Sequence, residues 1–200
     1  MTAKVLLVRH GQTDWNLTHR IQGSVDIPLN ATGLAQAAAT RDTFASRPFA
    51  LMVSSHLDRA RVTAEHINEA WAVEHRIDER LTERGHGPFE GWTWKEVVAH
   101  VGEEDADHFF QHSPELEGWP IVKQRMLDVL HETAAAVGSG TAIVVSHGGS
   151  IRAVIAEITG VHHRAMPSLF NCSVTELHFD GAWSVVDYNN NQHLPEALRT

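Results

Sequence analysis

The chain has 200 residues, of which 42% are apolar, and its formal net charge is −9 with the histidines counted as neutral. This size and composition suit one well-packed domain. The negative charge, without any run of Lys or Arg, argues against nucleic acid or an anionic membrane as partner. An anionic ligand therefore needs a local cluster of cations. Cys172 is the only cysteine, which excludes an internal disulfide, and since no segment resembles a signal peptide or a membrane span, we expect a cytoplasmic protein.

The first half of the chain alternates short apolar runs with helical periodicity. Residues 5–8 predict a buried strand, and apolar residues over 34–45 predict a helix that ends before Pro48. A second strand over 49–53 precedes a second helical pattern over 60–71. Such alternation is typical of parallel βαβ units, so we expect an α/β fold with a mostly parallel sheet and helices on both faces.

The second half repeats this unit once and then changes. A strand over 142–145 leads into a helical pattern over 151–158. Alternating apolar residues over 175–179 and a returning strand over 183–186 flank Asp180-Gly181, which is a favourable two-residue turn. These features predict one antiparallel hairpin at the edge of the sheet.

Residues 84–120 interrupt the alternation. The segment is rich in Gly, Trp, His and acidic residues, and it holds only a short helical pattern near Val97 and Val98. An insertion of this length in a compact domain is commonly a lid or a binding loop, and the alternative is a helical hairpin that packs on the sheet without a further role. We therefore expect a single domain over 1–200 with a lid-like insertion over about 84–120.

Two of the predicted strands end in the same way. The segment "VLLVRHG" places His10 and Gly11 after four apolar residues, and "AIVVSHGG" does the same with His147 and Gly148. Ligands of parallel sheets bind outside the carboxyl ends of the strands, so two adjacent strands would bring both imidazoles to one crevice. The glycines permit close approach of a ligand, and the helix expected to begin near Gly149 would point free N–H groups at it.

Two arginines are expected beside these histidines. Arg9 precedes His10, and Arg59 lies one turn beyond the end of the second strand. Two guanidinium groups, two imidazoles and a helix N-terminus suit a phosphate dianion, and the guanidinium charges favour a neutral His10 that can attack phosphorus. The leaving alkoxide needs an acid. Glu83 and Glu90 are the candidates, because a carboxyl near other acids or half-buried can hold its proton near neutral pH.

Several segments together resemble the histidine phosphatase superfamily, also called the phosphoglycerate mutase-like family. "LVRHGQTDWN", "SSHLDRARVTA", "LTERGHGPFEG" and "VSHGGSIRAVI" resemble its histidine, arginine and acid elements. "RIQGSVDIPLNATGLAQA" resembles its substrate-side loop and first helix, and "NCSVTEL" with "NNNQHL" its closing hairpin. The likeness runs nearly end to end in the right order and is weakest between about 95 and 125. It implies an enzyme that needs neither metal nor cofactor.

The resemblance also implies roles for individual residues. His10 would be the nucleophile that becomes phosphohistidine, and Glu83 would be the proton donor that later activates water. The phosphoryl group would be clamped by Arg9, Arg59 and His147. The phosphate or substrate side would be lined by Asn16, Gln22, Gly23 and the backbone at Gly148.

The sequence departs from the family at two places. Phe89 stands where the family usually carries Trp, and Glu117-Gly118 stands where a Glu-Ser pair commonly precedes Arg125. Neither position belongs to the presumed chemistry, although both can alter the substrate pocket. The spacing of the acid loop fits Glu83 better than Glu90 as the family's acid.

Other conspicuous residues have simpler interpretations. His108 and His112 have the spacing of metal ligands on a helix, but without an evident third ligand we expect them on the surface. His162-His163 and the acidic residues of 103–107 are expected in a solvated loop. Packing is the expected role of three tryptophans, Trp92, Trp94 and Trp119.

Three functions are compatible with these residues. The leading one is a phosphatase that passes the phosphoryl group of a small phosphorylated metabolite through phosphohistidine to water. The alternative is a cofactor-dependent phosphoglycerate mutase, which is less favoured because the loop over 84–90 has the short form of the phosphatase branch and acidic residues follow it. A non-catalytic phosphate binder is disfavoured because every presumed catalytic position is filled. A metal-dependent hydrolase is disfavoured because two guanidinium groups would repel a dication. The oligomeric state has no signature in the sequence.

Overall fold

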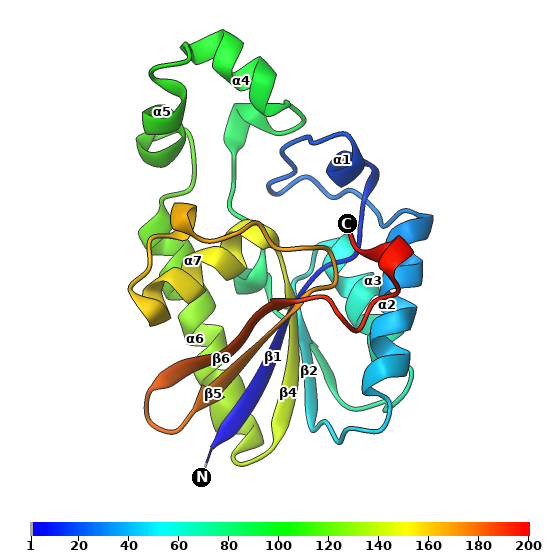
Figure 1. The fold of residues 1–200 in the computed structure, drawn as a ribbon. Coiled ribbons are helices and arrows are strands. Elements are labelled where there is room, and N and C mark those ends of the chain that lie inside the picture. The colour runs from blue at the N-terminus through cyan, green and yellow to red at the C-terminus, as the bar shows by residue number, and fades with distance from the viewer. Residues whose placement is uncertain (1) are drawn as a thin grey trace.

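The computed structural model describes residues 2–200 and is organised around one six-stranded sheet with the strand order β3-β2-β4-β1-β5-β6 (Figure 1). The strands are β1 (Ala3–Arg9), β2 (Leu51–Ser54), β3 (His75–Ile77), β4 (Thr141–Ser146), β5 (Val174–Phe179) and β6 (Trp183–Asn190). The first four run parallel, whereas β5 pairs antiparallel with β1, and β6 pairs antiparallel with β5. The mostly parallel sheet with an antiparallel edge hairpin is confirmed.

Helices cover both faces of this sheet (Figure 1). The α-helices of the described chain are α1 (Asp14–Leu17), α2 (Ala31–Phe44), α3 (Asp58–Asn68), α4 (Trp94–Val101), α5 (Ala106–His112), α6 (Trp119–Val137) and α7 (Gly148–Thr159). Short 3₁₀ turns are η1 (Glu79–Leu81), η2 (Gly87–Phe89), η3 (His163–Ala165) and η4 (Glu196–Leu198). Within residues 2–200, no helix has the length and apolar character needed to cross a membrane.

The central strand β1 explains how the two layers of helices are held. Val5 and Leu7 point to one face and pack in a cluster with residues of α6 and α7, and Leu6 and Val8 point to the other face and pack with residues of α3. Both faces of a parallel sheet are buried, so four consecutive apolar residues are needed in place of an alternating pattern. The exposed connections at the carboxyl ends of the strands are then available to form a site.

The sequence patterns predict neither β3 nor α6, nor the short helices α1 and α5 and the 3₁₀ turns. The edge strand β3 has only three residues, with Arg76 and Ile77 exposed, so it lacks the apolar run that marks the other strands. Helix α6 is long, and its buried residues, such as Val122, Met126 and Val129, recur at helical spacing. The helix begins at Trp119, inside the unusual segment over 84–120, so its start has no boundary in the sequence.

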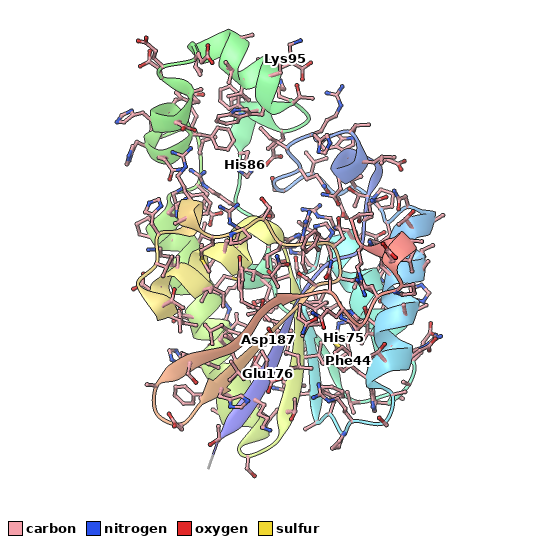
Figure 2. The ribbon with its side chains drawn as sticks, in the orientation of Figure 1. Phe44, His75, His86, Lys95, Glu176 and Asp187 are labelled. Carbon is pink, nitrogen blue, oxygen red and sulfur yellow. The ribbon has the colours of Figure 1, made fainter. Side chains whose placement is uncertain are left out.

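The segment over 84–118 leaves the sheet, and its helices α4 and α5 lie beyond the carboxyl ends of the strands (Figure 1). Phe89, Val97 and Leu116 form a small apolar cluster inside it. Figure 2 shows His86 beneath α4 and α5 on the side toward the sheet, whereas Lys95 lies on the outer side. The segment is thus a helical hairpin, as the alternative interpretation required, but it does not pack on the sheet. Its action as a lid stays a prediction.

Candidate active site

His10 and His147 meet at the carboxyl edge of the sheet. His10 follows β1 and His147 follows β4, which is the parallel neighbour of β1, and the two ring centroids lie 5.1 Å apart. His147 is also the N-cap residue of α7. The expectation that adjacent strands bring two imidazoles to one crevice is therefore confirmed.

The backbone fixes the tautomer of His10. Its Nδ1 lies 2.7 Å from the carbonyl oxygen of Gly11, and because a carbonyl only accepts, Nδ1 carries the hydrogen and Nε2 keeps its lone pair. The side chain is only 3% exposed. Burial lowers the pKa of His10 well below 6.5, and the charges of Arg59 and Arg9 lower it further, so the ring is neutral at pH 7. His10 is therefore neutral as expected, but burial lowers its pKa more than the guanidinium charges do.

His147 is held in the opposite tautomer. Arg59 Nε donates to His147 Nδ1 at 3.2 Å, which requires the hydrogen of the neutral ring to lie on Nε2. Burial and then the charge of Arg59 lower the pKa of His147 well below 6.5. His147 Nε2 is buried and has no hydrogen-bond partner in the described chain. This N–H group can therefore donate a hydrogen bond to a ligand.

The two arginines are positioned by backbone carbonyl groups. Arg59 Nη1 and Nη2 each donate at 2.7 Å, to Val25 and Gly23 respectively, and the side chain is fully buried. Burial lowers the pKa of Arg59 to about 10, which leaves it charged at neutral pH. Arg9 Nη1 donates to the carbonyl of Leu169, and its buried Nε has no partner in residues 2–200. Neither guanidinium is neutralised by a salt bridge in this part of the chain.

Glu83 occupies the N-terminus of α7, which corrects one expectation. The amides of Gly149 and Ser150 were expected to face a ligand, but they donate to the Glu83 carboxylate at 2.9 and 2.8 Å. The Arg84 amide donates to the same carboxylate at 2.9 Å. Only the first amide of the helix, at Gly148, remains available to a ligand beside the histidines.

The same contacts correct the expected protonation state of Glu83. Burial alone raises the pKa of Glu83, but hydrogen bonds from Gly149 and Arg84 and the charges of His86 and Arg59 outweigh it and lower the pKa. The carboxyl is therefore ionised at pH 7 in the free protein. It was expected to hold its proton near neutral pH, because the sequence does not reveal that helix amides face it.

Glu90, the second acid candidate, has a different position. Its carboxylate accepts from the backbone amides of Ser24 and His86 and does not line the cavity that holds Glu83. A side chain at Gly23, where φ is +54°, would collide with it, since a Cβ there would lie 2.0 Å from Glu90 Oε1. Glu90 therefore connects two loops, and the preference for Glu83 agrees with the geometry.

A set of contacts around Glu117 fastens the two ends of the inserted segment to each other beside Glu83. We call this set the clasp. Arg84 Nε donates to the Glu117 carbonyl at 2.7 Å, and the Gly85 amide donates to the Glu117 carboxylate at 3.1 Å. Arg125 forms an ion pair with Glu117 at 2.8 Å and donates to the carbonyl of Thr82 at 2.6 Å. Glu117, which matches the family, thus supports the acid loop, whereas the departure itself is Gly118, the N-cap residue of α6, which takes no part in these contacts.

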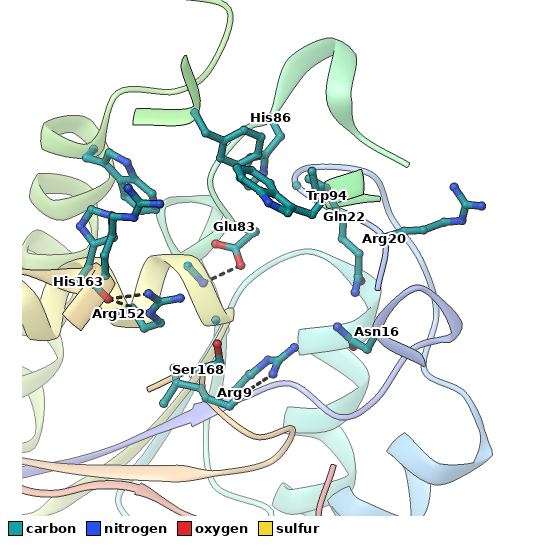
Figure 3. Close-up of a pocket in the computed structure, with 18 of the residues that line it drawn as sticks. Arg9, Asn16, Arg20, Gln22, Glu83, His86, Trp94, Arg152, His163 and Ser168 are labelled. Atoms are coloured by element: carbon teal, nitrogen blue, oxygen red, sulfur yellow. Dashed lines mark hydrogen bonds between the residues drawn. The ribbon is translucent and has the colours of Figure 1, made fainter. Parts of the chain in front are cut away.

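The remaining predicted residues line one cavity of about 600 Å³ at this edge (Figure 3). Asn16, Gln22, Gly23 and Gly148 all border it, together with Arg9, His10, Arg59 and Glu83. The side-chain oxygen of Gln22 is buried without a hydrogen-bond partner among the described residues. His147 is not among the residues that border the cavity, and its ring lies 5.1 Å from that of His10, which does.

Sequence reasoning missed much of the outer wall of the cavity. Trp94, Phe110 and His86 border it from the inserted segment, and Trp119, Arg152 and His163 border it from the base. The expectation of a solvated loop is wrong for His163, which is 7% exposed and whose ring lies 4.4 Å from that of Trp119. The spacing Gly148, Gly149, Arg152 on one helix face was the available signal for Arg152.

His108 and His112 are exposed on α5, with ring centroids 4.7 Å apart. This is the surface position that their sequence context predicted. Within residues 2–200, no three or more His, Cys, Asp or Glu side chains are grouped so that they could hold a metal ion.

The profile of the histidine phosphatase superfamily, branch 1, matches residues 5–191. The chain belongs to this superfamily. It is 35% identical to a protein named as an uncharacterized phosphatase of Bacillus subtilis, over 97% of each chain. It is 34% identical to a metal-independent phosphoserine phosphatase of Arabidopsis thaliana, covering 96% of this chain and 83% of that one.

A solved structure of this histidine phosphatase fold, Bacillus stearothermophilus YhfR, superimposes with a TM-score of 0.88 at 28% identity and covers 96% of this chain and 98% of that one. Phosphoglycerate mutases also occur among the named relatives. The sequence-based assignment to the superfamily, made on ordered motifs, is confirmed.

Proposed function

We propose that this histidine phosphatase is a metal-independent hydrolase of small phosphomonoesters that works through a phosphohistidine at His10. One observation carries the proposal: the two histidines are held in opposite tautomers. His10 Nε2 is a lone-pair donor to phosphorus, whereas His147 Nε2–H is a hydrogen-bond donor to a phosphoryl oxygen. A binding site needs donors only, so the unprotonated Nε2 favours nucleophilic catalysis over simple phosphate binding.

In the first step, Arg9, Arg59 and His147 hold the phosphoryl oxygens and neutralise their charge while His10 Nε2 attacks phosphorus in line. A P–N bond forms and the P–O bond to the alcohol breaks. Glu83 takes the proton that the phosphomonoester monoanion brings, which leaves the bound phosphoryl group as a dianion, and passes that proton to the leaving oxygen. The buried guanidinium groups supply the positive charge that a metal ion supplies in other phosphatases.

In the second step, water replaces the alcohol. Glu83, now ionised, accepts a proton from the water, which attacks phosphorus as the P–N bond breaks. Glu83 then gives this proton to the phosphate, inorganic phosphate leaves, and His10 and Glu83 return to their neutral and ionised forms. The side chains of Asn16 and Gln22 and the backbone at Gly23 and Gly148 border the space beside the phosphoryl group, and we assign them to substrate binding.

The mutase alternative requires the phosphoenzyme to be kept from water while the bound alcohol reorients. That function needs positive charge to retain a second phosphate group. The inserted segment instead presents Glu103, Glu104 and Asp105 as exposed acids, and Asp107 at the rim of the cavity. We therefore favour hydrolysis over transfer to a second hydroxyl.

Two further proposals concern the whole chain. We assign residues 1–200 to one domain, with the segment over about 84–120 acting as a lid whose Trp94 and Phe110 border the cavity. We place the protein in the cytoplasm. The buried free thiol of Cys172 is in keeping with that location.

The proposal is tested by trapping the intermediate. Brief incubation with a ³²P-labelled phosphomonoester followed by denaturation at alkaline pH, where phosphohistidine survives, should label the wild-type chain at His10. His10→Ala should abolish both labelling and turnover, while His108→Ala, which changes an exposed histidine, should alter neither. Near-normal turnover by His10→Ala, or label on a serine, would overturn the mechanism.

A further inference from the structure

Arg152 is a cation of the cavity that the proposed phosphoryl chemistry does not use. It lies on α7, one helical turn beyond Gly148 and Gly149, and so on the helix face that borders the phosphoryl site. Burial lowers the pKa of Arg9, and the charge of Arg152 lowers it further, which places the two guanidinium groups within electrostatic reach of each other.

The guanidinium of Arg152 is oriented by the backbone. Nε and Nη2 both donate to the carbonyl of His163, at 3.2 and 2.6 Å, as the dashed lines in Figure 3 show. Nη1 makes no hydrogen bond in the described part of the chain. A guanidinium fixed along one edge presents the other edge as a pre-organised donor, which lowers the entropic cost of binding an acceptor.

The charges around the cavity show that Arg152 has no partner of its own. Arg20 pairs with Glu96 at 3.6 Å, and Arg164 pairs with Asp107 across the rim. The cavity-lining cations without a carboxylate partner in residues 2–200 are Arg9, Arg59 and Arg152. A phosphomonoester dianion balances two of them. When Glu83 carries the proton for the leaving group and is neutral, the third positive charge, that of Arg152, remains unbalanced.

We infer that Arg152 binds a carboxylate of the substrate, and that the preferred substrates are phosphomonoesters of hydroxycarboxylic acids. This inference rests on the proposed phosphatase function. A carboxylate accepts from the free edge of one guanidinium with a charge-assisted hydrogen bond. Ser168 also borders the cavity.

A second phosphate group fits this subsite poorly. The neighbouring His163 is neutral at pH 7, because burial and the charges of His162 and Arg152 lower its pKa to about 4. At the rim, Arg164 is already paired with Asp107, so it offers no free cation to a second phosphate group. One guanidinium edge can balance a single negative charge, whereas the phosphoryl site uses two guanidinium groups and an imidazole N–H for a dianion. The cavity volume of about 600 Å³ leaves room for a further substituent on the acid.

The matched substrates are 3-phosphoglycerate and glycerol 3-phosphate, which share the same primary phosphoester and differ in a carboxylate against a hydroxymethyl group. Arg152→Gln should lower kcat/KM for 3-phosphoglycerate by about 10- to 100-fold, mainly through KM, and change that for glycerol 3-phosphate by less than about threefold. Arg152→Lys should restore part of the loss. Arg164→Gln, which removes another rim arginine, is the control and should not discriminate between the two esters.

Equal losses on both esters, or no loss on either, would overturn the carboxylate subsite while leaving phosphatase activity in place. Calorimetric binding of both esters to His10→Ala, with and without Arg152→Gln, gives a readout that does not depend on turnover. Tighter binding of 3-phosphoglycerate that disappears with Arg152→Gln supports the subsite. If that result accompanied a wild-type protein inactive on every phosphomonoester, including p-nitrophenyl phosphate, the proposed function would fail and the subsite would stand.

Discussion

Arg59 donates from Nε to Nδ1 of His147, and through this single contact a buried guanidinium decides which nitrogen of the imidazole carries hydrogen. The other two arms of Arg59 are held by the carbonyl groups of Gly23 and Val25, which belong to the loop beside the cavity. One side chain therefore orients a phosphate-binding donor, fixes the substrate-side loop and supplies charge.

Arg59→Ala should reduce kcat/KM by at least about 10²-fold, because a charge-assisted contact that strengthens in the transition state is worth several kcal/mol. Arg59→Lys should lose nearly as much, since an ammonium group cannot reach three fixed acceptors at once. Steady-state kinetics on p-nitrophenyl phosphate gives the measurement. Arg61→Ala is the control, because Arg61 lies on the same helix but pairs with Asp58 and Glu65 at the surface. Little change in Arg59→Ala would place Arg59 outside the site.

Glu83→Gln keeps the shape of the side chain and removes the transferable proton. Turnover of alkyl phosphates should fall by about 10²- to 10⁴-fold, and turnover of p-nitrophenyl phosphate should fall much less, because its leaving group needs little protonation. Glu90→Gln is the comparison, since Glu90 connects loops outside the cavity. Equal losses on good and poor leaving groups in Glu83→Gln would argue against a general acid in the first step and return Glu90 to consideration.

The dependence of kcat/KM on pH follows from the lowered pKa values of His10, His147 and Glu83. At pH 7 both imidazoles are neutral and the carboxyl group is ionised, so activity should be lost on the acid side only well below pH 6.5. The first step needs one more proton than the ionised enzyme carries, and the substrate monoanion supplies it. The alkaline limb should therefore lie at the second pKa of the phosphomonoester, which is about 6.

This prediction is tested by measuring kcat/KM against pH for two phosphomonoesters whose second pKa values differ. The alkaline limb should move with the pKa of the ester, and the acid limb should stay in place. An acid limb that follows the ester, with a fixed alkaline limb, would mean that free Glu83 is protonated at neutral pH and that its contacts to Gly149 and Ser150 do not set its pKa.

Prolonged treatment with EDTA followed by gel filtration should leave the rate of phosphate release unchanged. The reason is that the guanidinium groups of Arg9 and Arg59 and the N–H of His147 provide the charge stabilisation at the phosphoryl oxygens. A large loss of activity, restored by zinc or magnesium, would contradict the proposed mechanism and favour a metal-dependent one.

The centre of the site was predictable because it depends on strand ends. His10, Arg9 and His147 follow apolar runs that the sequence marks clearly, and Arg59 lies one turn into the next helix. Parallel strands of a buried sheet end at the same edge, so residues far apart in the chain can be placed together without coordinates. The ordered motifs then added Glu83.

The protonation state of Glu83 and the outer wall depend on tertiary contacts that leave no periodic signal. Whether helix amides face a carboxylate or a ligand is decided by where the loop before Arg84 runs, and the sequence of α7 is the same in both cases. His163 lies in a polar stretch and is nevertheless buried, because the ring of Trp119 lies against it. Local composition indicates solvent exposure on average, and single contacts override it.

The clasp makes the inserted segment a separable part of the enzyme. Arg84, Gly85 and Glu117 fix the two ends of the segment to each other next to Glu83, so the position of the acid is set below the point at which the chain departs. Residues 94–116 can then diverge, lengthen or be exchanged with those of another phosphatase while the reacting groups keep their places, because a closed loop base confines the change. Residues 86–93 have to stay, because Glu90 holds the substrate-side loop through the amide of Ser24. A chimera that retains Arg84, Gly85 and Glu117 would acquire a new substrate range on an inherited catalytic centre.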